Sequence, residues 1–348
     1  MSSSSLKTHL LHDIAEAAEF LKRGKLVAFP TETVFGLGAD ARNAQAIERL
    51  FLAKGRPADN PLIVHLADAA DWPLAAAQLP ELARRILARY SPGPVTVVVP
   101  KAAEICCSVT AGLKTVGLRI PAAPEARALL RGAGIPIAAP SANISGRPSG
   151  TSWQSVLEDL DGRIDALVCI NVQHVGLEST VIDCTGEVPI LLRPGSLGLD
   201  ELQTLYPNAR SLNPELNRQS NREQGREEES LGELTDRSVN SPGLRHPHYQ
   251  PIAQVQLLDA ASCWSIDNAA KVRACAYAGL DAPPPGMQLS HQFNDIGQYA
   301  HGFYEFLRTA DREGIDVIAL QAISIETASQ SGIAAALRDR QRRAAGLA

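Results

Sequence analysis

The sequence is poor in aromatic residues and cysteines, and these shortages exclude several classes of protein. Only 5% of the 348 residues are aromatic, too few for the stacking surfaces that bind single-stranded nucleic acid. Six cysteines without any Cys-x-x-Cys pair favour a reduced protein over a disulfide framework. No uncharged apolar run reaches about eighteen residues, and the first residues lack the order of a secretion signal. We therefore expect a cytoplasmic protein with no membrane segment.

The common catalytic motifs are also missing. There is no Walker-type Gly-x-x-x-x-Gly-Lys-Ser/Thr, no His-Glu-x-x-His and no Gly-x-Ser-x-Gly, and Gly36-Leu-Gly38 lacks the third glycine of a dinucleotide fingerprint. His246 and His248 have no neighbouring cysteine or carboxylate to complete a ligand set. We therefore expect no metal site built by the protein itself.

The charge balance limits the class of partner. The 33 basic and 38 acidic residues give a net charge of −5, which disfavours tight duplex binding driven by counterion release. Apolar residues make up 45% of the chain, enough for a core, and its length predicts one large or two ordinary domains.

Short apolar runs dominate the first two hundred residues. Helical periodicity occurs at 44–54 and 80–90. Strands are expected at 26–29, 62–66, 95–99, 116–120, 135–139, 166–170, 179–183 and 190–192. Many strands with few helices predict an α/β (α+β) domain, residues 10–207, around one large twisted mixed sheet.

The remainder predicts a linker followed by a smaller domain. Residues 208–251 contain a charge-rich stretch, 213–237, that we expect to be a flexible insertion, followed by a stiff Ser-Pro-Gly…His-Tyr segment. Residues 252–348 predict a small Rossmann-like α/β domain. Its strands are expected at 252–258, 272–278 and 317–320 and its helices at 295–313 and 329–345. The arginines of 338–343 are expected at a solvated helix end.

Four polar loops follow predicted strands or a helix, at 30–38, 54–65, 115–121 and 138–151. They are rich in hydroxyls, amides and glycines, the groups that form anion-binding nests. In the third, Thr115, Gly117 and Arg119 share one strand face because side chains alternate.

Each loop residue also has an ordinary interpretation. Lys54 and Arg56 would complement the dipole at a helix C-terminus. Arg119 needs a partner, and either the Glu32 carboxylate or a substrate anion would serve. Turn formation or a structural hydrogen bond is the ordinary role of the others, Ser141, Asn143 and His65.

Taken together, the motifs closely resemble the YrdC/Sua5 family of L-threonylcarbamoyladenylate synthases. The matching segments, in order, are Pro30–Leu37, Lys54–His65, Ser91–Thr96, Gly117–Pro121, Ala139–Gly146, Ser179–Asp183 and Leu192–Gly195. The Ser-Pro-Gly segment at 241–251 and the helix near 331–340 resemble the linker and C-terminal domain of the longer, Sua5-type members. Phe35 and Leu244 depart from the commoner Tyr and Met, and 213–237 is longer than expected.

The resemblance implies a nucleotidyltransferase that makes threonylcarbamoyl-AMP and pyrophosphate from L-threonine, bicarbonate and ATP with Mg²⁺. The product would supply the modification of tRNA adenosine 37. The implied partners are therefore the downstream tRNA threonylcarbamoyl-transferase machinery and, weakly, tRNA itself.

Matching positions give the implied site residues. L-Threonine would contact Thr33, His65, Arg119, Ala139 and Ser179. ATP would contact Arg56, Asn60, Thr115, Ser141, Ser149 and Arg193. Lys54, Arg56, Ser141 and Asn143 would form the catalytic pairs. The linker residues Arg245, His248 and Tyr249 would close over the nucleotide as a lid.

Two alternatives remain at this stage. A double-stranded RNA-binding module would use basic residues of a concave cavity, and its affinity would fall steeply with salt. A related enzyme would act on another carbamoyl donor, as in hydrogenase maturation proteins, although this chain lacks their acylphosphatase and zinc-finger segments.

Overall fold

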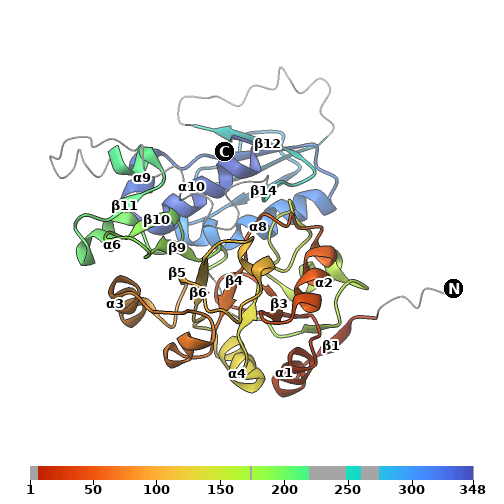
Figure 1. Cartoon of the computed structure of the whole chain (residues 1–348). Coiled ribbons are helices and arrows are strands. Elements are labelled where there is room, and N and C mark those ends of the chain that lie inside the picture. The colour runs from red at the N-terminus through yellow and green to blue at the C-terminus, as the bar shows by residue number, and fades with distance from the viewer. Residues whose placement is uncertain (1–6, 173–174, 219–247, 260–273, 348) are drawn as a thin grey trace.

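Two sheets organise the chain. The computed structural model describes residues 7–172, 175–218, 248–259 and 274–347. The larger sheet occupies the centre of Figure 1, and the smaller sheet lies above it, with helices α8 and α10 between them. Residues 272–273 of the strand predicted at 272–278 lie outside the described residues, as do residues 219–237 of the flexible insertion expected at 213–237. The first residues of that stretch differ from the expectation, because 214–218 are helical and Leu216 is buried.

The large sheet is mixed, and within the described residues it has 11 strands. β4 runs parallel to β6, whereas β5 runs antiparallel to β6 and parallel to β9. In spatial order the strands are β1 (His9–Leu11), β8 (Ala166–Val168), β2 (Val27–Phe29), β3 (Gly36–Asp40), β7 (Ile137–Ala138), β4 (Ile63–His65), β6 (Thr115–Arg119), β5 (Val95–Pro100), β9 (Thr180–Asp183), β10 (Ile190–Arg193) and β11 (Arg210–Ser211).

Helices cover both faces of this sheet. Val27 and Phe29 belong to the apolar cluster formed with α1 and α4, whereas Leu26 and Ala28 belong to the cluster that contains α2. This alternation is expected of a strand buried on both sides. The helices are α1 (Ile14–Lys22), α2 (Ala44–Lys54), α3 (Glu81–Tyr90), α4 (Pro124–Ala133), α5 (Trp153–Leu160) and α6 (Leu199–Leu205), with 3₁₀ turns at Ala69–Leu74 and Cys107–Thr110.

The small sheet is entirely parallel, in the order β12-β15-β13-β14. Its strands are β12 (Gln254–Leu258), β15 (Val317–Gln321), β13 (Cys275–Gly279) and β14 (Leu289–Gln292), and its helices are α8 (Ile296–Arg312), α9 (Ile325–Ser329) and α10 (Gly332–Ala344). We call residues 252–347 the C-terminal unit. A parallel sheet with packed helices confirms the expected Rossmann-like character.

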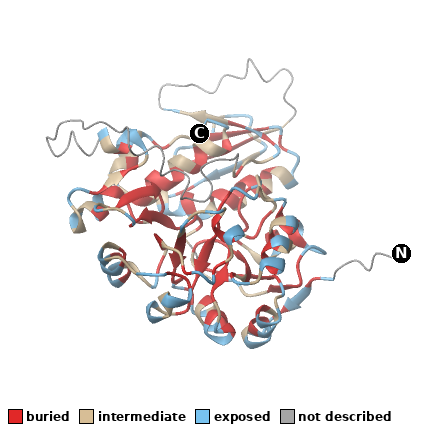
Figure 2. Cartoon of the chain, viewed as in Figure 1, coloured by how far each residue is buried: buried red, intermediate tan, exposed pale blue. Residues whose placement is uncertain are grey.

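Burial follows this layering. In Figure 2 most strands of the large sheet and the inward sides of α8 and α10 are buried, whereas β14 and most of β12 are not, and α1, α3 and α4 expose their outer sides. Among the described residues, none of the helices has both the length and the apolar character needed to cross a bilayer.

The predicted large mixed sheet is confirmed, but some local predictions are wrong. Gly36 to Gly38 belong to strand β3 rather than to a loop, because Gly36 and Gly38 pair with Phe29 and Val27 of β2. The helix expected at 329–345 is confirmed as α10, which begins at Gly332, and the short helix α9 that ends at Ser329 was not expected. Apolar stripes at α1, α4, α5 and α6 were missed.

Candidate active site

A polar cavity lies on one face of the large sheet, over β4 and β6. Ile63 and His65 share this face, and the register pairs His65 with Arg119. Gly117 pairs with Ile63 and contributes no side chain to fill the space. The cavity is lined by Thr31, Thr33, Val34, Phe35, Gly36, Arg56, Pro61, Leu62, Ile63, His65, Arg119, Ala139, Pro140, Ser141, Asn143, Glu178, Ser179, Arg193, His248 and Tyr249.

Arg119 presents a buried guanidinium to this cavity. It is 4% exposed, its Nη2 lies 2.7 Å from Oε1 of Glu32, and its Nη1 donates to the Thr33 hydroxyl at 2.9 Å. Burial, the largest single effect, raises the pKa of Glu32, but the charge of Arg119, its hydrogen bond and backbone hydrogen bonds together outweigh burial and lower that pKa. Arg119 therefore has the carboxylate partner considered from sequence and also faces the space a substrate anion would enter.

His65 is a neutral imidazole in this setting. Burial, followed by the nearby charge of Arg119, lowers its pKa from 6.5 to about 3. Its ring meets Phe29 edge-on, with the centroids 6.4 Å apart. The side chain thus offers a hydrogen bond without a charge.

Ser179 connects two of the predicted groups. Its hydroxyl lies 2.8 Å from that of Thr96, and Nη2 of Arg193 donates to its carbonyl at 3.0 Å. The peptide N–H of Ala139 donates to Ile63 at 2.9 Å and holds the next loop against β4. The predicted threonine residues Thr33, His65, Arg119, Ala139 and Ser179 all line the same cavity.

Lys54 has a different position from the one its motif suggests. The side chain is 1% exposed, and Nζ donates to the carbonyls of Ser141, at 2.6 Å, and Asn143. Burial and the charge of Arg56 lower its pKa well below the ordinary value. Lys54 is not among the residues that line the cavity, but it fastens the loop whose Ser141 and Asn143 do.

The predicted ATP residues divide into two groups. Arg56, Ser141 and Arg193 line the cavity. Asn60 lies just behind it, where its amide nitrogen is 3.2 Å from Nε2 of His248. Like Asn60, the other two are not among the lining residues: Ser149 is buried and Thr115 begins β6, four residues before Arg119.

Two of the three predicted lid residues lie at the cavity, and Arg245 lies outside the described residues. Tyr249 is 5% exposed and has φ of 65°, in the left-handed region that non-glycine residues rarely adopt. The backbone conformation of Tyr249 requires firm support from the surroundings. At the neighbouring His248, burial, followed by the charge of Arg56, lowers the pKa to about 3.

Sequence reasoning missed three buried residues beside the cavity: Glu178, Tyr304 and Arg340. Arg340 is 0% exposed, so the expectation of a solvated helix end is wrong at this position. The signal was weak, because the α10 pattern of small apolar residues around Arg340 does not distinguish a buried from an exposed arginine.

Comparison with known proteins matches both parts of the chain. The family model named for Sua5, YciO and YrdC, and described as "Telomere recombination", matches residues 19–195. The chain belongs to the Sua5/YciO/YrdC family. A second model, described as "Threonylcarbamoyl-AMP synthase, C-terminal domain", matches residues 202–346.

Members of the Sua5/YciO/YrdC family align over most of the chain. A protein named threonylcarbamoyl-AMP synthase from Pyrococcus abyssi is 36% identical over 95% of this chain and 93% of its own length. The Bacillus subtilis protein of the same name is 40% identical over 71% and 67%. A crystal structure of P. abyssi Sua5 complexed with L-threonine superposes with a TM-score of 0.80 at 35% identity, covering 96% of this chain and 94% of that one. These relatives do not favour the RNA-binding alternative.

Proposed function

We propose that this chain is a threonylcarbamoyl-AMP synthase that converts L-threonine, bicarbonate and ATP into threonylcarbamoyl-AMP and pyrophosphate. The observation that carries the proposal is the placement of Arg119, a buried cation facing a cavity that also contains Arg56 and Arg193. Relatives at 36–40% identity carry the name of this activity. One amino acid carboxylate and one triphosphate account for this distribution of positive charge.

In this proposal the threonine carboxylate binds Arg119 beside the Thr33 hydroxyl. The guanidinium already holds a carboxylate in this place, since Glu32 is 2.7 Å away, so the local geometry suits a second charge-assisted contact. His65 stays neutral and contributes a hydrogen bond to the amino acid. Ser179, which immediately precedes β9, completes this end of the cavity.

The chemistry requires positioning and charge stabilisation more than a protein nucleophile. The neutral amine of threonine combines with bicarbonate to form a carbamate, with loss of water. A carbamate oxygen then attacks the α-phosphorus, the bond from that phosphorus to the bridging oxygen breaks, and pyrophosphate leaves. Arg56 and Arg193 would stabilise the phosphate charge, while the loop of Ser141 and Asn143, fastened by Lys54, would align the nucleotide.

Magnesium enters this proposal as part of the MgATP substrate. Across the described ranges, no group of three His, Cys, Asp or Glu side chains could hold a metal ion. Glu178, which lines the cavity, and Glu32, which contacts the lining residue Arg119, are each paired with an arginine. We therefore propose that the ion bridges phosphate oxygens and keeps most of its water ligands.

His248 and Tyr249 would exclude water from the adenylate. Both line the cavity, and Tyr249 is almost fully buried. A mixed anhydride hydrolyses readily, so a site that forms one benefits from a dry enclosure. We propose that these residues form the lid, and that the product passes in the cytosol to the machinery that modifies tRNA.

The direct test is pyrophosphate release by the full chain with ATP, magnesium and ¹³C-bicarbonate, with and without L-threonine. We expect release that requires both threonine and bicarbonate, and a product whose mass contains AMP, threonine and one ¹³C carbon. Equal release without threonine would overturn the proposal. Replacing bicarbonate and threonine with carbamoyl phosphate tests the alternative carbamoyl donor, and we expect no turnover.

A further inference from the structure

The C-terminal unit reaches the cavity through two buried side chains on α8 and α10. Nε of Arg340 donates to Oε2 of Glu178 at 3.0 Å, and the Tyr304 hydroxyl donates to the same oxygen at 2.9 Å. The Ser149 hydroxyl donates to Oε1 of Glu178 at 2.7 Å. Glu178 lines the cavity, whereas Arg340 and Tyr304 do not. The two C-terminal side chains thus contact the cavity only through other residues.

The Glu178 carboxylate is held as an anion by this arrangement. Burial alone would raise its pKa, but the charges of Arg340 and Arg193 and the Ser149 hydroxyl outweigh burial and lower it to about 2. Removing Arg340 would leave a buried carboxylate facing Arg193 with one less cation. The unbalanced charge of Glu178 would then attract Arg193, which contacts Ser179, away from its present position.

Arg340 also supports two other segments at the cavity. Its Nη1 donates to the carbonyl of Pro194, the residue after Arg193, at 3.1 Å. Its guanidinium carbon lies 5.5 Å from the centre of the Tyr249 ring, within the range of a cation–π contact. One side chain therefore touches the segments that carry Glu178, Arg193 and Tyr249.

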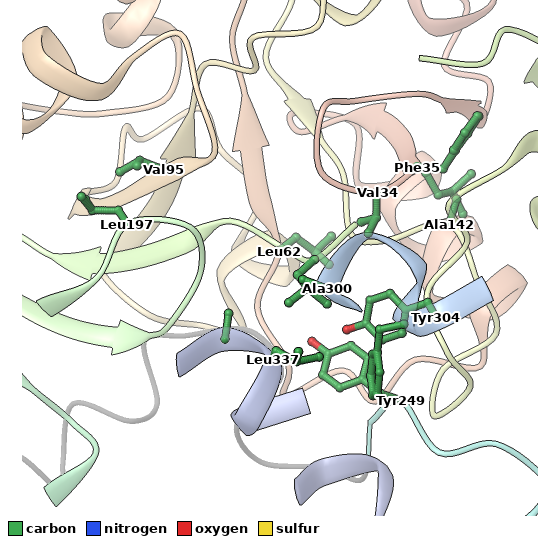
Figure 3. Close-up of a cluster of buried hydrophobic side chains, with 14 of the residues drawn as sticks. Val34, Phe35, Leu62, Val95, Ala142, Leu197, Tyr249, Ala300, Tyr304 and Leu337 are labelled. Atoms are coloured by element: carbon green, nitrogen blue, oxygen red, sulfur yellow. The ribbon is translucent and has the colours of Figure 1, made fainter. Parts of the chain in front are cut away.

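Tyr304 packs against the ring of Tyr249. Its ring centroid is 5.3 Å from that of Tyr249, at an interplanar angle of 35°. Figure 3 shows the two rings side by side, one from α8 and one from the end of the linker, with Leu337 of α10 beside them. Because Tyr249 has a positive φ, its ring depends on these neighbours for its position.

We propose that Arg340 and Tyr304 are positioning residues for the nucleotide end of the cavity. They fix Glu178, Arg193 and Tyr249 together, so that the C-terminal unit sets the geometry in which ATP is held. The inference rests on the proposed function where it assigns Arg193 and Tyr249 to ATP. The main threonine contact lies apart from this group, because Arg119 takes its contacts from Glu32 and Thr33. Arg193 reaches the threonine end only through Ser179, so we expect a smaller effect there.

The burial of the ion pair between Arg340 and Glu178 supports a positioning role for Arg340. A buried ion pair is often no more stabilising than apolar side chains of similar volume. Arg340 is fully buried and its contacts are distributed over three segments that line the cavity. A guanidinium is suited to that task because its planar fork fixes direction as well as charge.

The experiment compares two ligands by calorimetry, without turnover. The probes are α,β-methylene-ATP with Mg²⁺, which cannot release pyrophosphate, and L-threonine. We expect Arg340→Met to weaken binding of the nucleotide analogue by about 10- to 100-fold and of threonine by less than about threefold. Tyr304→Phe, which removes one hydroxyl, should weaken the nucleotide analogue by about three- to tenfold. Arg340→Lys should recover part of the loss.

The matched control is Arg312→Met, which removes an exposed arginine of α8 that pairs with Glu158 at 3.4 Å. It should leave both affinities unchanged. Wild-type nucleotide affinity in Arg340→Met, or equal weakening of both ligands, would overturn the proposal. Should Arg340→Met fail to fold, Tyr304→Phe decides by the same comparison. A wild-type chain that binds the analogue but releases no pyrophosphate would refute the proposed function alone.

Discussion

The Arg119 guanidinium and the Glu32 carboxylate form a 2.7 Å ion pair in the wall of the cavity, on residues 87 positions apart in the chain. The other oxygen of Glu32 accepts from the backbone N–H of Ala123 at 3.3 Å. The pair therefore fixes the guanidinium in direction while one side of it still faces the cavity. A substrate carboxylate would meet a cation that is already oriented.

Arg119→Ala is expected to weaken L-threonine binding by about 10- to 100-fold, because charge-assisted hydrogen bonds are the stronger kind. Calorimetric titration with threonine measures the effect. Arg131→Ala, which removes an exposed arginine paired with Asp68 at 2.8 Å, serves as the control and should bind threonine normally. Unchanged threonine affinity in the Arg119 variant would refute the assigned role.

The five residues that the family resemblance assigns to threonine line one cavity, and most of them lie at the ends of strands. The pairing of His65 with Arg119 across β4 and β6 places side chains from separate motifs next to each other. The alternation of side chains along a strand is a local rule that the sequence reveals directly. The resemblance of the ordered motifs to a known family predicts which segments share the cavity. The position of the Lys54 side chain is harder to predict, because a motif does not indicate whether a lysine faces the ligand or the loop beside it.

The C-terminal contribution was not predictable in the same way. Arg340 and Glu178 are 162 positions apart, and no periodicity in either segment indicates that they meet. The contact depends on how α10 packs on the large sheet, which is a property of the assembled core. An arginine flanked by other arginines and small apolar residues is typical of a solvated helix end as well.

His65 predicts a loss of stability in mild acid. Its pKa is lowered to about 3 in the folded chain, so between pH 6.5 and 3 only the unfolded state takes up its proton. Stability is therefore unaffected above the unfolded pKa and falls by about 1.4 kcal/mol per pH unit below it. Denaturant unfolding at pH 7.5 and 5.0 should show a smaller decrease for His65→Gln than for the wild type.

The control for this experiment is His9→Gln, since His9 is exposed on β1. That variant should lose as much stability between the two pH values as the wild type does. If His65→Gln and the wild type lost stability in parallel, the imidazole would not be neutral in the folded chain.

The motif that contains Lys54 allows two roles for this side chain, and a substitution can distinguish them. As a fastener of the 141–146 loop, it supplies donors to two carbonyls, so Lys54→Met should lower the free energy of unfolding by about 1–3 kcal/mol as well as reduce activity. As a phosphate ligand alone, it would affect activity without affecting stability. Thermal unfolding of Lys54→Met beside the exposed Lys22→Met tells these roles apart, and an unchanged melting temperature would contradict the structural role.

Arg308 of α8 forms a second buried link between the C-terminal unit and the large sheet. Its Nη2 lies 2.7 Å from Oδ2 of Asp159, and both side chains are almost fully buried. The same Asp159 oxygen accepts from the backbone of Ile144, in the loop that carries Asn143. This ion pair therefore secures the fold and also supports a loop of the cavity.

Asp159→Asn leaves the buried Arg308 charge with only the more distant carboxylate of Glu158, 3.8 Å away, so we expect a loss of about 3–5 kcal/mol in the free energy of unfolding. The double variant Asp159→Asn/Arg308→Met removes both charges and should recover much of that loss. The exposed pair of Glu81 and Arg84 offers a contrast, since Glu81→Gln should cost no more than about 1 kcal/mol. Urea titration measures all three, and additive losses in the double variant would show that the two charges are not coupled.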